Sequence, residues 1–361
     1  MDIAIGTRRY SHQALHGFVV AVLEVLRVPG EDARLAADTL IAADLSGVDS
    51  HGVARFAGHP SYVPGLRNGK VNPTPRPRIV SQAAATALYD GDGGMGVVVG
   101  TRAMRVAIEK ARAAGCGLVT VTNSRHFGIA AHFAKMALGQ DMIGIAMTNA
   151  YPQAVQTGGA TASLGTNPIS IAAPAGDERP FVLDIATSVG AAGKAEIALR
   201  QGKQLPQGWL VDSKGQPTTD PGVIFGGGGA LLPLGSFPEL ASHKGYGLAV
   251  AVDVLCGVLS GAGYGAILDP TGWSTGHFFG AIRIDAFRAA PAFKAMMDDM
   301  VRFLRNVPTV PGYGRMYVHG ERELETEAER RANGIPLHPQ VVASLEALTP
   351  EVEVPFPEAL S

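Results

Sequence analysis

Residues 87–121 read ALYDGDGGMGVVVGTRAMRVAIEKARAAGCGLVTV. The apolar triplet 87–89 predicts a short strand, and residues 97–114 have the three- and four-residue apolar spacing of a helix. A second β-rich run, GLVTV at 117–121, predicts the next strand. This strand–helix–strand order is typical of an α/β fold.

The same alternation continues outward. We expect a helix over 129–138, a strand over 142–147, further strands over 169–173 and 181–183, an apolar helix over 245–259 and a late strand over 277–284. Because later strands follow one another directly, we predict a mixed sheet layered with helices rather than a purely parallel one.

Both ends of the chain are helical in pattern. Ser11 can cap a first helix that ends at Pro29-Gly30, and a second helix is expected over 31–45. Near the C-terminus, we expect a charged helix over 321–333 and a last one over 340–348. Proline-rich residues 73–77 predict a domain boundary. We therefore predict a helical domain made of residues 1–75 and 310–361 around a mixed α/β domain of residues 76–309.

Composition narrows the class of protein. The 361 residues are 46% hydrophobic and 17% charged, with a net charge of −2, which favours neither nucleic acid nor an anionic membrane as partner. The two cysteines have no metal-type spacing and fit a reducing compartment. We expect no secretory signal, no membrane span and no metal site, and hence a cytoplasmic protein.

Residues 91–96, GDGGMG, match the dinucleotide-binding pattern G-x-G-x-x-G. A Rossmann unit also needs an acidic residue at the end of the following strand. That strand ends in Val121-Thr122-Asn123-Ser124, without a carboxylate. We therefore favour a structural glycine turn over a phosphate-binding loop.

The most informative stretch is DLSGVDSHGVAR, residues 44–55. If the backbone is helical from Ser50, His51 and Arg55 share a face. Reduction of a 2-oxo acid needs a proton donor at the C2 oxygen and a cation on the carboxylate, and an imidazole and a guanidinium supply these. Ser50 can orient the imidazole. The alternative is that this cluster caps helix ends and that Arg55 forms a surface ion pair.

Three further clusters are candidate ligand-binding segments, and each can also be explained by local structure alone. Residues 123–132, NSRHFGIAAH, lie where a strand gives way to a helix, so they either bind an anion or form an ordinary helix start capped by Ser124. LGTNP at 164–168 taken alone predicts an Asn-Pro turn. HKGYG at 243–247 places two basic residues at a helix start, which is unfavourable unless an anion binds there.

With these clusters in view, the sequence closely resembles the non-Rossmann malate/L-lactate dehydrogenase family, whose members include ureidoglycolate, sulfolactate and diketogulonate enzymes and piperideine-2-carboxylate reductase. The matching motifs run in order from about residue 10 to 348: GVDSHG at 47–52, NP at 72–73, DGDGG at 90–94, SRHFG at 124–128, LGTNP at 164–168, LDIATS at 183–188, GW at 208–209, PTTDP at 217–221, LLPLG at 231–235, HKGYG at 243–247, GERE at 320–323 and ANGIPL at 332–337.

The resemblance implies an oxidoreductase that moves a hydride between NAD or NADP and C2 of a small 2-hydroxy or 2-oxo carboxylate. It implies a homodimer with the active site near the subunit boundary, a cofactor domain at 76–309 and a substrate and dimerisation domain made of the two ends. It also implies His51 as proton donor supported by Ser50, with His126 as the other candidate acid/base, and Arg55 and Thr166 as substrate contacts.

Cofactor contacts implied by the resemblance are His126, Phe127, Gly128, Ile129, Ala130, Asp184, Ile185, Ala186, His243, Lys244, Gly320 and Glu321. Two departures matter. Lys194 stands where the cyclic-imine reductases carry an aspartate, which favours a hydroxy acid over the alternative substrate, a cyclic 2-carboxy imine. Residues 236–241 lengthen the loop before His243, so the placement of His243 and the choice between NAD and NADP stay open. A non-catalytic binding protein is the remote alternative.

Overall fold

The computed structural model describes residues 6–268 and 274–360. A seven-stranded sheet has the order β2-β3-β4-β11-β5-β6-β7. Its strands are β2 (Arg78–Gln82), β3 (Thr86–Asp90), β4 (Cys116–Ser124), β5 (Met142–Thr148), β6 (Ile169–Ala173), β7 (Phe181–Ile185) and β11 (Thr275–Arg283). Only β3 and β4 pair in parallel, and the other neighbours are antiparallel. The predicted mixed sheet is confirmed.

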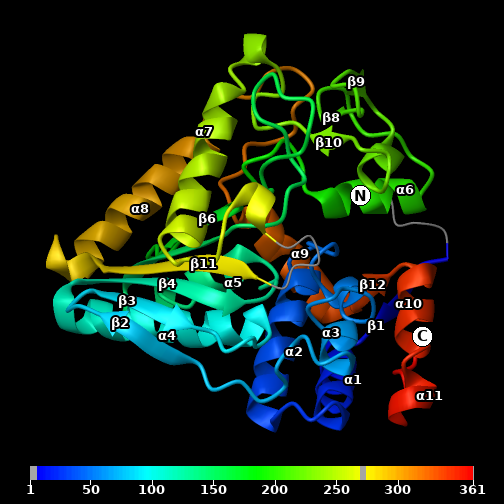
Figure 1. Cartoon of the computed structure of the whole chain (residues 1–361). Helices are drawn as coiled ribbons and strands as arrows, with labels where there is room; N and C mark the ends of the chain where they lie inside the picture. The colour runs from blue at the N-terminus through cyan, green and yellow to red at the C-terminus, as the bar shows by residue number, and fades with distance from the viewer. Residues whose placement is uncertain (1–5, 269–273, 361) are drawn as a thin grey trace.

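Strand β11 shows how the layers arise. Successive side chains of a strand point to opposite faces. Phe279 packs in a core with residues of α4 (Gly96–Ala114) and α5 (Ala130–Lys135), whereas Phe278 packs with residues of α7 (His243–Val252) and the π-helical turn η5 (Asp253–Val258) that continues it. Helices therefore cover the sheet on both faces, with α7 above it and α4 below it in Figure 1.

The two chain ends pack together. Helices α1 (His12–Val25), α2 (Gly30–Leu45), α3 (Val63–Arg67), α9 (Glu321–Asn333), α10 (Pro339–Glu346) and α11 (Thr349–Val352) come from both ends, and β1 (Arg8–Tyr10) pairs with β12 (Ile335–Leu337). Ser11 caps α1 as expected, because its side chain accepts a hydrogen bond from the Ala14 N–H. One hydrophobic core joins residues 10–98 with residues 335–352. The exact domain boundaries stay a prediction.

Several elements differ from the sequence-based expectation. Helix α5 ends at Lys135 instead of residue 138, and β4 covers Cys116–Ser124, longer than the GLVTV run of 117–121. Ser124 does not cap α5, because β4 buries it and its hydroxyl bonds to His277 Nε2. The prediction did not include β2, the amphipathic helix α8 (Ala290–Arg305), or the small sheet of β8 (Leu210–Val211), β9 (Pro217–Thr218) and β10 (Ala230–Leu231).

The glycine-rich turn 91–96 serves backbone packing. A Cβ on Gly96 would lie 1.9 Å from the carbonyl oxygen of Arg125, and a Cβ on Gly91 would lie 2.8 Å from that of Asn123. Only glycine allows this approach. The turn therefore supports the end of β4, directly before His126. Among the described residues, no helix is long and apolar enough to cross a membrane.

Candidate functional site

The loop after α2 is held by buried charges. The Asp44 carboxylate accepts a hydrogen bond from the Val53 N–H at 2.8 Å, and a Cβ on Gly52 would overlap that carboxylate. Arg330 of α9 donates to the Asp44 carbonyl and to the Asp49 carboxylate. Helix α9 thereby fixes the loop that carries Ser50 and His51.

Ser50 joins the imidazole and the guanidinium. Its hydroxyl lies 2.8 Å from His51 Nδ1, and its carbonyl oxygen accepts a hydrogen bond from Arg55 Nε at 2.7 Å. Residues 50–52 form a turn and a bend, followed by the 3-10 turn η1 (Val53–Arg55), so the α-helix considered for this stretch is not formed. The two side chains are nevertheless brought together by a shared neighbour.

His126 reaches the same site from the end of β4. The hydroxyl of Tyr62 lies 3.1 Å from His126 Nδ1, the Gly128 N–H also donates to that nitrogen, and Ser61 Oγ accepts from the His126 N–H. Because Nδ1 accepts, a neutral His126 carries its proton on Nε2. The ring stacks on His51 with centroids 5.5 Å apart. The site therefore lies where the helical core meets the sheet core.

A third imidazole, that of His59, was not predicted from the sequence, and its ring centroid lies 4.8 Å from that of His126. All three rings are partly exposed. Burial, and next the Arg55 charge, lower the pKa of His51 to about 4 and that of His59 to about 3. Burial also lowers the pKa of His126, followed by the effects of His59, His51 and Arg55. The imidazoles are therefore neutral near pH 7. The His59 N–H bonds to the Arg55 carbonyl oxygen, a one-turn spacing that could have revealed His59.

Helix α6 (Ala192–Arg200) closes the site from the third side. Glu196 Oε2 lies 2.8 Å from Arg55 Nη1, and the other oxygen of that carboxylate bonds to Arg200. A Cβ on Gly193 would lie 2.4 Å from Ser50 Cβ, so a glycine is needed for this close approach. Glu196 is a second residue that the sequence analysis missed. Lys194, also on α6, is exposed, and its Nζ lies 5.9 Å from the centroid of Trp209.

The other predicted substrate and helix-start residues lie outside this cluster. The Thr166 carbonyl accepts hydrogen bonds from the backbone and hydroxyl of Thr187, and within the described ranges no bond joins Thr166 to the imidazoles. His243 and Lys244 are exposed at the start of α7. Both side chains can therefore meet a ligand, but nothing in the contacts links them to His51.

The remaining predicted cofactor contacts group around α5. Phe127, Ile129 and Ala130 are buried, so only the backbone of this segment can meet a ligand. The exposed Asp184 accepts a hydrogen bond from the Ala131 N–H at 2.9 Å. Desolvation of its carboxyl group raises the pKa of Asp184 to about 6. Ile185 and Ala186, which follow it, are partly buried.

The turn before α9 adjoins the same strand. Gly320 has φ 97°, and a Cβ there would lie 3.0 Å from Val182 Cβ. The Glu321 carboxylate is buried and bonds to Arg305 and to the Val318 N–H. That side chain is therefore already occupied, and only the backbone of this turn is available to a cofactor.

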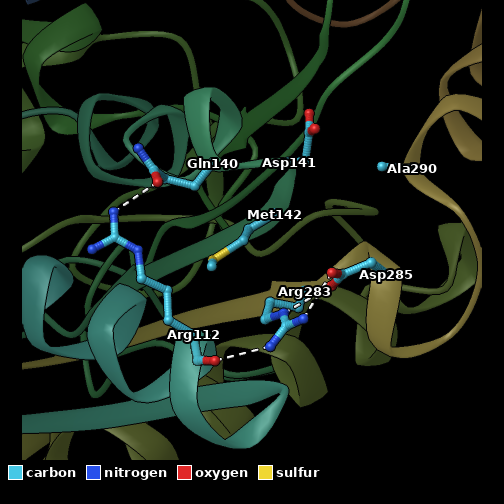
Figure 2. A pocket seen from close by; sticks show the side chains of 7 residues that line it. All are labelled: Arg112, Gln140, Asp141, Met142, Arg283, Asp285 and Ala290. Atoms are coloured by element: carbon cyan, nitrogen blue, oxygen red, sulfur yellow. Dashed lines mark hydrogen bonds and ion pairs between the residues drawn. The ribbon is translucent and has the colours of Figure 1, made fainter.

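No cluster of metal ligands is found among the described residues, and a surface cavity lies away from this site. Within residues 6–268 and 274–360, no three His, Cys, Asp or Glu side chains are arranged to hold a metal ion. A cavity of about 290 Å³ lies where β5 begins and β11 ends. It is lined by Arg112, Gln140, Asp141, Met142, Arg283, Asp285 and Ala290. Figure 2 shows its guanidinium groups bonded to Gln140 and Asp285, so they are already paired.

Neutral imidazoles with open Nε2 atoms beside a guanidinium form an acid–base site for a small carboxylate, as a dehydrogenase of hydroxy acids requires. Residues 10–346 match the model of the malate/L-lactate dehydrogenase family. The chain is 44% identical to a malate dehydrogenase of Pyrococcus abyssi (96% of this chain, 95% of that one), and 39% identical to an L-sulfolactate dehydrogenase of Methanocaldococcus jannaschii (87% and 88%).

Structure agrees with sequence. The crystal structure of malate dehydrogenase from Entamoeba histolytica superposes with a TM-score of 0.94 at 37% identity, covering 98% of this chain and 100% of the other. The chain belongs to the malate/L-lactate dehydrogenase family, and it is an oxidoreductase of hydroxy acids. Dehydrogenases of this family use nicotinamide cofactors.

Proposed function

We propose that the chain catalyses hydride transfer between NAD or NADP and C2 of a small 2-hydroxy or 2-oxo carboxylate of the malate, lactate, sulfolactate or ureidoglycolate type. The observation that carries this proposal is the arrangement of His51 and His126 beside Arg55. Each of these two imidazoles is held at Nδ1 and has no hydrogen-bond partner at Nε2 among the described residues.

Arg55 binds the C1 carboxylate of the substrate in this proposal. A guanidinium fork can hold a carboxylate by two parallel hydrogen bonds. Its Nε already donates to Ser50, and its Nη1 faces Glu196. The substrate carboxylate therefore displaces or shares the position of the Glu196 carboxylate. Thr166 remains a proposed substrate contact on the evidence of resemblance.

His51 exchanges the proton of the C2 oxygen. Its lowered pKa, caused first by burial, keeps it neutral and able to accept a proton during oxidation of the hydroxy acid. In the reverse direction the protonated ring donates to the oxygen. The Ser50 hydroxyl holds Nδ1, which leaves Nε2 for the substrate. His126 is the second candidate: its Nε2 is also open, but the neutral ring carries its proton there, so it would have to move that proton to Nδ1 before it could accept one from the substrate.

The donor set around α5 fits a nicotinamide dinucleotide. Asp184 is exposed and uses Oδ2 for the Ala131 N–H, so its other oxygen can accept a ribose hydroxyl. The backbone of 126–130 and of Gly320-Glu321 adjoins it, and Ile185 and Ala186 continue the strand. His243 and Lys244 are the side chains proposed to meet phosphate. When bound, the nicotinamide supplies or accepts the hydride.

We also propose a homodimer in the cytoplasm. Helix α8 exposes Met296, Met300 and Phe303, which share one face by their spacing. Such a contiguous apolar face marks a protein interface. It lies within residues 76–309, not in the helical domain to which we assigned dimerisation. Cys116 and Cys256 are free thiols, which fits a reducing compartment.

A substrate panel tests the proposed function. Purified enzyme is mixed with NADH or NADPH and with oxaloacetate, pyruvate, sulfopyruvate or a cyclic 2-carboxy imine, and absorbance of the reduced nicotinamide is followed. We expect turnover of at least one 2-oxo acid and none of the imine. Turnover of the imine alone would overturn the proposal in favour of the imine reductase.

A further inference from the structure

We propose that His59 determines substrate specificity: its Nε2–H donates a hydrogen bond to an anionic oxygen group on C3 of the substrate. His59 would thereby favour substrates with a carboxylate or sulfonate at C3 over those with a methyl group. This inference rests on the proposed function of the site, and it concerns a residue to which the sequence analysis gave no role.

The first step is the orientation of the ring. His59 Nδ1 accepts a hydrogen bond from the Ser61 N–H at 3.2 Å, so a neutral His59 carries its proton on Nε2. No other described residue bonds to the His59 ring nitrogens, and the side chain is partly exposed. Its Nε2–H is therefore a donor available to a ligand.

The second step is location. The His59 ring packs against His126 at 4.8 Å and against Tyr62 at 5.9 Å, and Ser61 also accepts from the His126 N–H. Burial is the largest cause of the lowered pKa of His59, followed by the charge of Arg55 and then by His51. The Arg55 charge also lowers the pKa of His51. His59 therefore belongs to the same polar wall as the proposed acid–base pair.

The third step is chemistry. Arg55 and His51 account for the C1 carboxylate and the C2 oxygen, which leaves the Nε2–H groups of His126 and His59. Because the His126 ring stacks on His51, we assign the group on C3 to His59. A methyl group cannot accept a hydrogen bond from a neutral N–H, whereas an anionic oxygen can. A hydrogen bond to a charged group is stronger than one between neutral groups, and it gives a preference of roughly tenfold or more. Burial of the donor against a methyl group would leave it unpaired.

The test compares oxaloacetate with pyruvate in wild type, His59→Phe and His59→Gln. Phenylalanine keeps a ring against His126 and removes the donor, whereas glutamine keeps an amide N–H near Nε2. We expect wild type to prefer oxaloacetate. We expect His59→Phe to lower kcat/KM for oxaloacetate about 30-fold, mainly through KM, with pyruvate changed less than 3-fold. His59→Gln should recover most of the loss.

Three results would overturn the inference: a wild-type preference for pyruvate, an unchanged ratio in His59→Phe, or equal losses for both substrates. Equal losses would show that His59 acts by packing on His126. Calorimetric binding of malate and lactate to wild type and His59→Phe gives the same comparison without turnover. If wild type reduces no 2-oxo acid, the proposed function fails, and the binding ratio still decides the role of His59.

Discussion

Glu196 Oε2 lies 2.8 Å from Arg55 Nη1, on the guanidinium that we propose binds the substrate carboxylate. A protein carboxylate thus takes a position that the proposed substrate carboxylate needs. This relationship joins α6 to the loop of His51, two segments far apart in the sequence.

Replacement of Glu196 by glutamine should favour substrate binding. The neutral amide competes less for the guanidinium, and a partly exposed ion pair of this kind contributes at most about 1 kcal/mol. We expect Glu196→Gln to lower KM for the preferred 2-oxo acid about 3-fold with little change in kcat. Glu329→Gln, at the surface pair with Arg9, is the matched control and should leave KM unchanged. A rise in KM would show that Glu196 orients Arg55 instead.

Replacement of Arg55 by lysine should weaken substrate binding. An ammonium cannot form the two-pronged contact, nor keep the Nε bond to Ser50. We expect KM to rise roughly 10- to 100-fold, with kcat reduced less than 3-fold, in steady-state kinetics. Arg67→Lys, at the pair with Glu351, serves as control. Wild-type KM in Arg55→Lys would place the substrate carboxylate elsewhere.

The fold followed from patterns that are local in the sequence. The strand–helix–strand unit of 87–121 and the helix over 321–333 were predicted because their apolar or capping patterns lie within one element. Helix α8 was missed because one of its faces is exposed and apolar, so its sequence did not indicate which residues are covered. Glu196 was missed because its role comes from a contact between α6 and Arg55, far away in the sequence. The contact of His59 with His126 is equally distant in the sequence, and only its one-turn spacing from Arg55 was a local signal.

Acid should destabilise the fold through His277. Burial lowers its pKa to about 3, and Ser124 and Thr148 hold its ring by hydrogen bonds. His277 is protonated below about pH 6.5 in the unfolded chain but stays neutral in the folded chain down to about pH 3. Its contribution to the free energy of unfolding is therefore fully present above about pH 6.5 and is lost as the pH falls toward about 3. Between pH 7 and 5 this one group costs on the order of 2 kcal/mol.

Urea unfolding at pH 7 and pH 5 measures this effect. His277→Gln keeps polar atoms but does not titrate, so its free energy of unfolding should fall less than that of wild type, by about 2 kcal/mol. His319→Gln, at an exposed side chain, is the control and should behave as wild type. An equal fall in His277→Gln and wild type would contradict the assignment.

An aspartate on the apolar face of α8 should separate the subunits. Phe303 is 70% exposed in the single chain, and a charge there would be buried in the proposed interface. We expect Phe303→Asp to shift the mass measured by light scattering from dimer to monomer. Val25→Asp, at an exposed site on α1, tests the alternative of dimerisation through the helical domain. Dissociation by Val25→Asp alone would favour that alternative.

The most direct measurement is kcat of His51→Ala beside His126→Ala, with nicotinamide affinity followed by fluorescence. Loss of the group that exchanges the C2 proton should lower kcat of His51→Ala by about 100-fold or more while the Kd of the cofactor stays within 2-fold. Turnover near the wild-type value in His51→Ala, with the large loss in His126→Ala instead, would contradict the assignment of His51 and transfer its role to His126.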